Sequence, residues 1–134
     1  TDCLSERLHI IYQGIYDAIS QYQPQMTAIE EVFFSRNAQS ALKLGQARGA
    51  AIAACANHGF SVAEYSARQI KQAVVGYGAA SKTQIQQMIK MMLHLDTTPP
   101  SDAADALAIA ICHCHQHKVL DKLNRARITA GEGA

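Results

Sequence analysis

The chain has 134 residues, of which 49% are hydrophobic and 17% are charged, and its formal net charge is +1. This length suits one domain and the apolar fraction suffices for a core, so intrinsic disorder and a disulfide scaffold are not indicated. No run approaches the roughly 20 apolar residues of a membrane span, and the first residues lack a signal-peptide pattern. We therefore expect a cytoplasmic protein.

The small net charge conceals an asymmetry along the chain. Residues 32–95 hold seven of the 12 Lys and Arg residues but only one of the 11 Asp and Glu residues. A basic middle segment between acidic ones suits an enzyme that acts on a polyanion through a carboxylate-bound metal. Ordinary solvated helix faces would give the same pattern.

The first half of the chain alternates helices with short strands. Apolar residues recur at intervals of three and four through residues 3–22, which predicts an amphipathic helix that ends before Pro24. Residues 26–31 read as a short buried strand, 38–57 as a helix rich in small residues, and 60–65 as another strand. This alternation predicts an α/β domain with a partly parallel sheet covered by helices.

The second half of the chain is predicted to be helical. Residues 67–74 read as a short helix, and Ser81 is the expected N-cap of a helix over 81–95. A further helix is predicted at 102–117, after a break that contains two prolines. Residues 118–134 are basic and end in glycines, and we expect them to form a flexible C-terminal tail.

Three acidic residues carry the strongest functional signal. Glu30 ends the predicted strand 26–31, and Asp102 and Asp105 stand three residues apart at the start of a predicted helix. Carboxylates at such positions can converge on one hard divalent cation, because Mg²⁺ prefers oxygen ligands. The pattern predicts a metal-dependent nuclease site. The alternatives are a solvated strand-end glutamate and first-turn aspartates favoured by the helix dipole.

The cysteines and histidines suggest no zinc site. The four cysteines have no repeated C-x-x-C spacing, and we expect free thiols that pack as small hydrophobic residues. His113 and His117 stand four residues apart in a stretch that also holds Cys112 and Cys114. Consecutive helical residues point about 100° apart, so this stretch cannot close a four-ligand shell by itself.

Four segments in unbroken order closely resemble the bacterial RuvC Holliday-junction resolvase family. They are AIEEVFF at 28–34, NAQSALKLGQARG at 37–49, RQIKQAVVG at 68–76 and DAADALAIA at 102–110. The resemblance implies an RNase H-like fold, with a mixed sheet flanked by helices. It also implies a homodimer that nicks two strands of a four-way DNA junction symmetrically. The expected cofactor is Mg²⁺, with Mn²⁺ as an alternative, at two ions per active site.

The resemblance assigns roles to individual residues. The residues that match metal-binding catalytic acids are Glu30, Asp102 and Asp105. Phe33 matches a position that stacks on an unpaired base, although an aromatic residue at a strand exit is more often core. The expected phosphate contacts are Arg36, Arg68, Lys71 and Lys82. The two lysines match essential lysines of the family, whereas Arg68 could be an ordinary helix surface charge.

One departure from the family pattern concerns its first acid, an Asp on the opening strand in an Asp-x-Gly setting. Asp2 has no Gly two residues on, so that role is not transferred to it. We expect residues 1–117 to be an RNase H-like nuclease domain whose opening strands are missing from this chain, because a sheet without its central hairpin would leave apolar faces uncovered. The other possibility is a truncated, inactive product.

Two other functions stay open at this point. The first is a different RNase H-like nuclease, such as a YqgF-type relative, and the second is a non-catalytic DNA-junction binding module. Family membership would add the RuvA and RuvB branch-migration proteins as partners. The helix at 38–57 is the candidate dimer contact, because its small residues allow close approach. The alternative is that the small residues let this helix lie close on the sheet.

Overall fold

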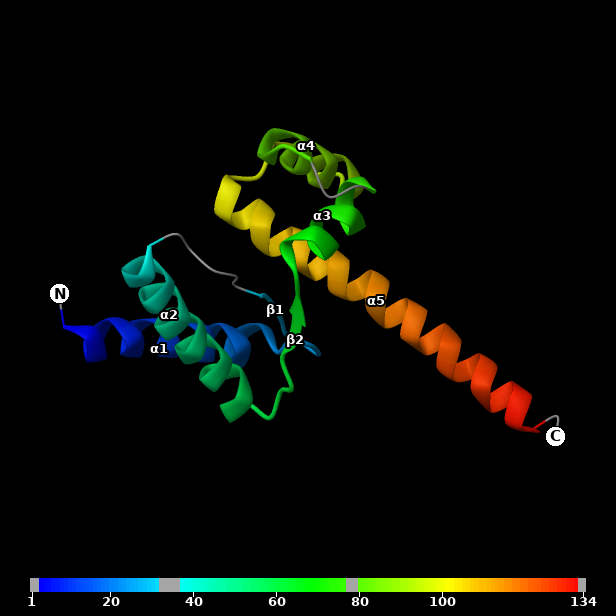
Figure 1. The fold of residues 1–134 in the computed structure, drawn as a ribbon, viewed down its shortest axis with the longest axis horizontal. Coiled ribbons are helices and arrows are strands. Elements are labelled where there is room, and N and C mark those ends of the chain that lie inside the picture. Colours follow the sequence, from blue (N-terminus) through cyan, green and yellow to red (C-terminus); the bar gives the residue numbers. More distant parts are fainter. Residues whose placement is uncertain (1–2, 32–36, 77–79, 133–134) are drawn as a thin grey trace. The chain divides into compact units, whose positions relative to one another are not determined.

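The computed structural model describes residues 3–31, 37–76 and 80–132 (Figure 1). Helices and strands follow one another as α1, β1, α2, β2, α3, α4 and α5 within these ranges. The chain divides into two compact units, residues 1–64 and residues 65–134. No helix of the described ranges is long and apolar enough to cross a membrane.

The first unit is built on two packed helices, α1 (Leu4–Tyr22) and α2 (Ala38–Asn57). Helix α1 ends where Gln23 adopts a left-handed conformation, one residue before Pro24. Asn37 caps the start of helix α2, and its side chain accepts hydrogen bonds from two first-turn amides. The α2 bounds agree with the sequence prediction, because both ends carry local signals.

Two short strands pair into a parallel sheet beside these helices, namely β1 (Ala28–Glu30) and β2 (Ala63–Tyr65). The amide of Ala63 donates to the carbonyl of Thr27 at 3.1 Å, which sets the register. The predicted strands 26–31 and 60–65 are therefore too long. The amide of Phe60 donates to the carbonyl of Cys55 and so closes α2 rather than extending the strand.

The second unit packs three helices together: α3 (Ala67–Val75), α4 (Lys82–Met92) and α5 (Ser101–Glu132). Helices α3 and α4 each begin with a capping box, and the predicted cap at Ser81 is confirmed. Helix α4 ends before the predicted residue 95, because His94 adopts a left-handed conformation.

Small side chains on α5 make room for its neighbours. Ala104, Ala108 and Cys112 recur every fourth residue and are at most 2% exposed. Ile89 of α4 is also fully buried, and Ile70 of α3 is nearly so. This stripe lets α3 and α4 lie against the N-terminal half of α5, which therefore presents its other face outward (Figure 1).

The C-terminal segment differs from the prediction. The helix expected to end at residue 117 continues to Glu132, so the predicted helix end is wrong. Residues 118–130 contain neither Pro nor Gly and include several strong helix formers, so nothing in them interrupts the helix. The described side chains beyond residue 117 are exposed.

All four cysteines are free thiols, as predicted. Their predicted role as small packed residues holds for Cys112, which is buried, and in part for half-buried Cys55. Cys3 and Cys114 are exposed, so the prediction is wrong for these two. Cys114 lies two residues beyond Cys112 on α5, and two residues on a helix point to different faces.

Candidate active site

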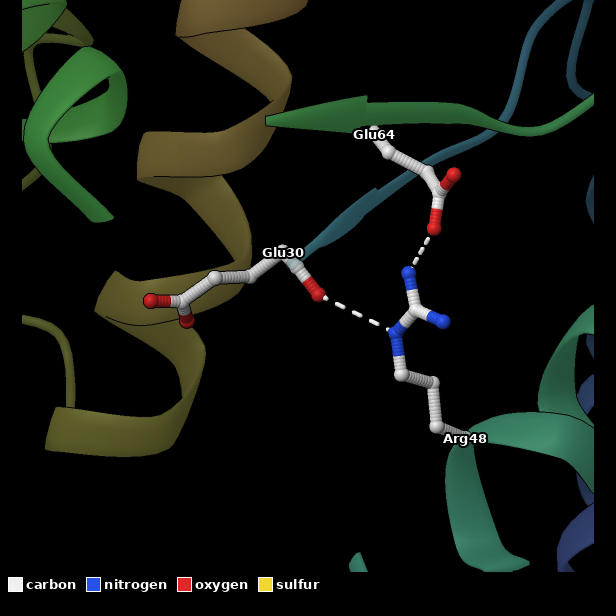
Figure 2. A network of polar contacts seen from close by, with 3 residues as sticks. All are labelled: Glu30, Arg48 and Glu64. Atoms are coloured by element: carbon white, nitrogen blue, oxygen red, sulfur yellow. Dashed lines mark hydrogen bonds and ion pairs between the residues drawn. The ribbon is translucent and has the colours of Figure 1, made fainter. Parts of the chain in front are cut away.

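Glu30 is the last residue of β1 and is half-buried. Its backbone carbonyl accepts a hydrogen bond from Nε of Arg48 on α2 at 3.4 Å. The Arg48 guanidinium also forms an ion pair with Glu64 on β2. The Glu30 carboxylate points away from Arg48, and is therefore not engaged by this network (Figure 2).

Arg48 and Glu64 are residues that sequence analysis missed. The sequence signal for them was weak: one arginine within a helix and one glutamate in a strand, 16 positions apart. The pairing of β2 with β1 brings Glu64 beside the end of β1, and Arg48 reaches both strands from helix α2.

Asp102 and Asp105 occupy the first turns of α5, and both are exposed. They lie three residues apart and so share one side of the helix. Ala104, between them in sequence, is fully buried, which directs the two carboxylates away from the helix packing. The structure thus brings these two predicted metal ligands together.

Lys82 is the first residue of α4, directly after the capping residue Ser81. Its ammonium lies 3.4 Å from the Asp105 carboxylate, and the two side chains are 61% and 50% exposed. A cation at a helix N-terminus is disfavoured by the helix dipole, so the ion pair offsets an unfavourable position. The predicted phosphate contact Lys82 and the predicted metal ligand Asp105 are therefore neighbours.

Two further predicted phosphate contacts lie on α3. Arg68 is exposed and Lys71 is half-buried, and the three-residue spacing places both on one side of the helix. The other two predicted DNA contacts, Phe33 and Arg36, lie outside the described residues.

A metal ion is implied by the acids, and their chemistry suits a hard divalent cation. Carboxylate oxygens at the carboxyl end of a strand and at a helix start are the donors that Mg²⁺ prefers. Within the described ranges, no three His, Cys, Asp or Glu side chains are grouped so that they could hold a metal ion. Glu30 belongs to the first unit and the aspartates to the second, and the convergence of all three carboxylates stays a prediction from the sequence.

The cysteine- and histidine-rich stretch of α5 makes structural contacts. Nδ1 of His113 lies 2.6 Å from the hydroxyl of Tyr65, a hydrogen bond between the end of β2 and α5. His117 lies 3.5 Å from Asp121, one turn further along the helix. Burial raises the pKa of the Tyr65 hydroxyl and also that of the Cys112 thiol.

Comparisons with known proteins agree with this architecture. The family model described as crossover junction endodeoxyribonuclease RuvC matches residues 1–113. A protein of that name from Coxiella burnetii is 57% identical over 128 residues, which cover 96% of this chain and 74% of the relative. Another, from Pseudoalteromonas atlantica, is 57% identical over 123 residues, covering 92% of this chain and 71% of the relative.

Solved structures of RuvC are also similar to this chain. The RuvC structure from Thermus thermophilus is 35% identical, with a TM-score of 0.80, and the match covers 88% of this chain and 72% of that one. The same protein in complex with a Holliday junction substrate matches with a TM-score of 0.83 at the same identity and coverage. These matches identify the fold as that of the RNase H-like nucleases, as predicted. The chain belongs to the RuvC family of crossover junction endodeoxyribonucleases. A YqgF-type relative is thereby ruled out.

Proposed function

We propose that this protein is a structure-selective endonuclease that resolves four-way DNA junctions in recombination and repair. It does so by symmetric, metal-dependent hydrolysis of phosphodiester bonds. The observation that carries this proposal is the match, over 88% of the chain, to a RuvC structure in complex with a Holliday junction substrate.

The proposed metal ligands are Glu30, Asp102 and Asp105, and the proposed cofactor is Mg²⁺, with Mn²⁺ as an alternative, at two ions per active site. When bound, the ions make water a better nucleophile and offset the charge on the leaving oxygen. The three carboxylates would hold the ions. Lys82 forms an ion pair with Asp105, and a metal held by Asp105 would leave the Lys82 ammonium available to a DNA phosphate.

Binding of the junction is proposed to depend on basic side chains, most of them in the second unit. Arg68, Lys71 and Lys82 lie on helices α3 and α4, which pack on each other and on α5. Cations of this kind provide most of the affinity for a phosphate backbone. Arg36 is a further proposed phosphate contact, and Phe33 is proposed to stack on an unpaired base near the branch point.

A junction with two-fold symmetry calls for a two-fold enzyme, and we propose that α2 forms part of the dimer contact. Gly45 and Gly49 lie one turn apart on α2, and a Cβ atom built at either meets no described atom within 4 Å. Leu42 and Leu44 of the same helix are 63% and 50% exposed. A second copy would cover these apolar side chains. RuvA and RuvB are the proposed branch-migration partners.

Substitution of the acids in the full-length protein tests the function. Glu30→Gln, Asp102→Asn and Asp105→Asn should each abolish junction cleavage in Mg²⁺ or Mn²⁺, because they remove charge where the metal is held. Binding of the intact junction should stay within a few fold, because no phosphate-binding cation is lost.

Asp121→Asn is the matched control, since Asp121 lies on α5 beyond the helix packing and contacts His117. It should cut normally. Retained cleavage in one acid variant would remove that residue from the site. An unsubstituted protein that binds junctions without cutting them in either metal would instead be a non-catalytic binding module.

A further inference from the structure

Arg48 connects three elements of the first unit at the place where Glu30 ends β1. Its Nε donates to the Glu30 carbonyl at 3.4 Å, and its Nη2 forms an ion pair with Glu64 on β2 (Figure 2). We propose that Arg48 is a positioning residue for Glu30, which fixes the end of β1 and thereby the direction of the Glu30 carboxylate. This inference rests on the proposed function, in which Glu30 is a metal ligand.

The chemistry of the guanidinium suits this task. Its donors lie in one rigid plane, so two bonds in different directions fix both acceptors relative to each other. Here the acceptors come from the two paired strands: a backbone carbonyl of β1 and a carboxylate of β2. A lysine offers a single flexible nitrogen and cannot reproduce this planar arrangement.

The end of β1 needs such support. The strand has three residues, and β2 is its partner in the sheet that the described residues form. So short a ladder leaves the last residue with few backbone bonds to hold it in place. Displacement of a catalytic group by about 1 Å can cost about 100-fold in rate, so the position of this backbone matters for the attached carboxylate.

Two other roles for Arg48 fit the structure less well. Its side chain is 23% exposed, and two of its guanidinium nitrogens already contact protein acceptors. The adjacent Glu64 carboxylate would also repel a DNA phosphate. As for stability, Glu64 is 47% exposed, and an ion pair with so exposed a partner stabilises a fold only slightly.

The test compares Arg48→Gln, Arg48→Lys and Glu64→Gln in the full-length protein. Lys43→Gln is the matched control, because it removes one positive charge from an exposed position on the same helix. Mn²⁺ affinity is measured without DNA by electron paramagnetic resonance. Cleavage rate, junction affinity over a range of salt concentrations, and melting temperature are measured in parallel.

Arg48→Gln should weaken Mn²⁺ binding and slow cleavage by about 10- to 100-fold, the usual effect of removing a group that orients a metal ligand. Melting temperature and junction affinity should change little. Arg48→Lys should recover only part of both losses, and Glu64→Gln should show smaller losses, because the bond from Nε to the carbonyl remains. Lys43→Gln should behave as the unsubstituted protein does.

Native Mn²⁺ affinity in Arg48→Gln would overturn the proposal, and so would full recovery of Mn²⁺ affinity and cleavage rate in Arg48→Lys. The proposal would also fail if Arg48→Gln flattened the salt dependence of junction binding by the amount expected for the loss of about one phosphate contact. If Arg48→Gln fails to fold, Arg48→Lys and Glu64→Gln decide the question. Failure of the unsubstituted protein to cut junctions would count against the proposed function instead, since Mn²⁺ affinity is measured without cleavage.

Discussion

Replacement of Lys82 by alanine should separate DNA binding from folding stability. Lys82 is the first residue of α4, where the helix dipole disfavours a cation by about 0.3–1 kcal/mol. Its ammonium lies 3.4 Å from Asp105, with both side chains at least half exposed. At that separation in water the attraction is about 1 kcal/mol, and exposed pairs contribute about 0–1 kcal/mol after the entropy cost.

These two contributions are similar in size and opposite in sign. We therefore expect Lys82→Ala to change the free energy of unfolding by less than about 1 kcal/mol, or a few degrees in melting temperature. The effect on DNA should be larger. Loss of one phosphate contact should weaken junction binding and flatten the dependence of log K on log salt by about 0.9, or about 0.7 where the strand is unpaired.

Lys90 is the matched control because it lies in the last turn of the same helix, where the dipole favours a cation. Lys90→Ala should cost about 0.3–1 kcal/mol of stability and leave the salt dependence unchanged. Fluorescence anisotropy with a labelled junction, without a metal that supports cutting, measures the affinity. Thermal unfolding measures the stability.

Lys82→Ala should therefore have the larger effect on junction binding, and Lys90→Ala the larger effect on stability. An unchanged salt dependence in Lys82→Ala would make Lys82 an ordinary surface lysine. A melting temperature lowered by ten degrees or more would show that the ion pair with Asp105 contributes far more than its exposure allows. Lys71→Ala should flatten the salt dependence in the same way.

Two further predictions concern an aromatic side chain and the thiols. Phe33→Ala should leave the melting temperature nearly unchanged and sharply reduce cutting of a fully paired junction, with partial recovery on a junction already unpaired at the crossover; a stability loss of about 3–5 kcal/mol without recovery would instead identify a core residue. The Ser5 hydroxyl lowers the pKa of the exposed Cys3 thiol, whereas burial raises that of Cys112. The thiolate is the reactive form, so alkylation of Cys3 should reach its half-maximal rate at a lower pH than alkylation of Cys112, as followed by mass spectrometry, and the reverse order would contradict these shifts.

Local signals in the sequence were sufficient for several elements. The predicted bounds of α2 agree with the structure, in which Asn37 caps the start of the helix and Gly59 has a positive φ just after its end, and the start of α4 follows from the predicted cap Ser81. Such signals act within one helical turn, so they can be read without knowledge of the rest of the fold. The family, too, could be recognised from four short segments in order, and the comparisons confirm it.

The predictions from sequence were wrong for features that depend on the rest of the fold, namely the end of α5 and the start of the second strand. The helix was predicted to end at residue 117, because the basic composition beyond that residue suggested a tail. Residues 118–130 contain no Pro or Gly, however, and α5 continues to Glu132. The predicted second strand extended back to Phe60, whose amide in fact closes α2. Strand length is set by backbone pairing with a neighbour, and apolar patterning alone does not show which amides a ladder uses.

In the candidate site, too, some features could be predicted from the sequence and others only from the tertiary structure. The sequence by itself identified Glu30, Asp102 and Asp105 as an acid set suited to a divalent metal, because residue type and spacing carry that chemistry. Only the tertiary structure decided that Lys82 is the partner of Asp105, and that Arg48 joins the end of β1 to Glu64. Each of these contacts joins residues from different elements, and side chains far apart in sequence meet only through the packing of helices and strands.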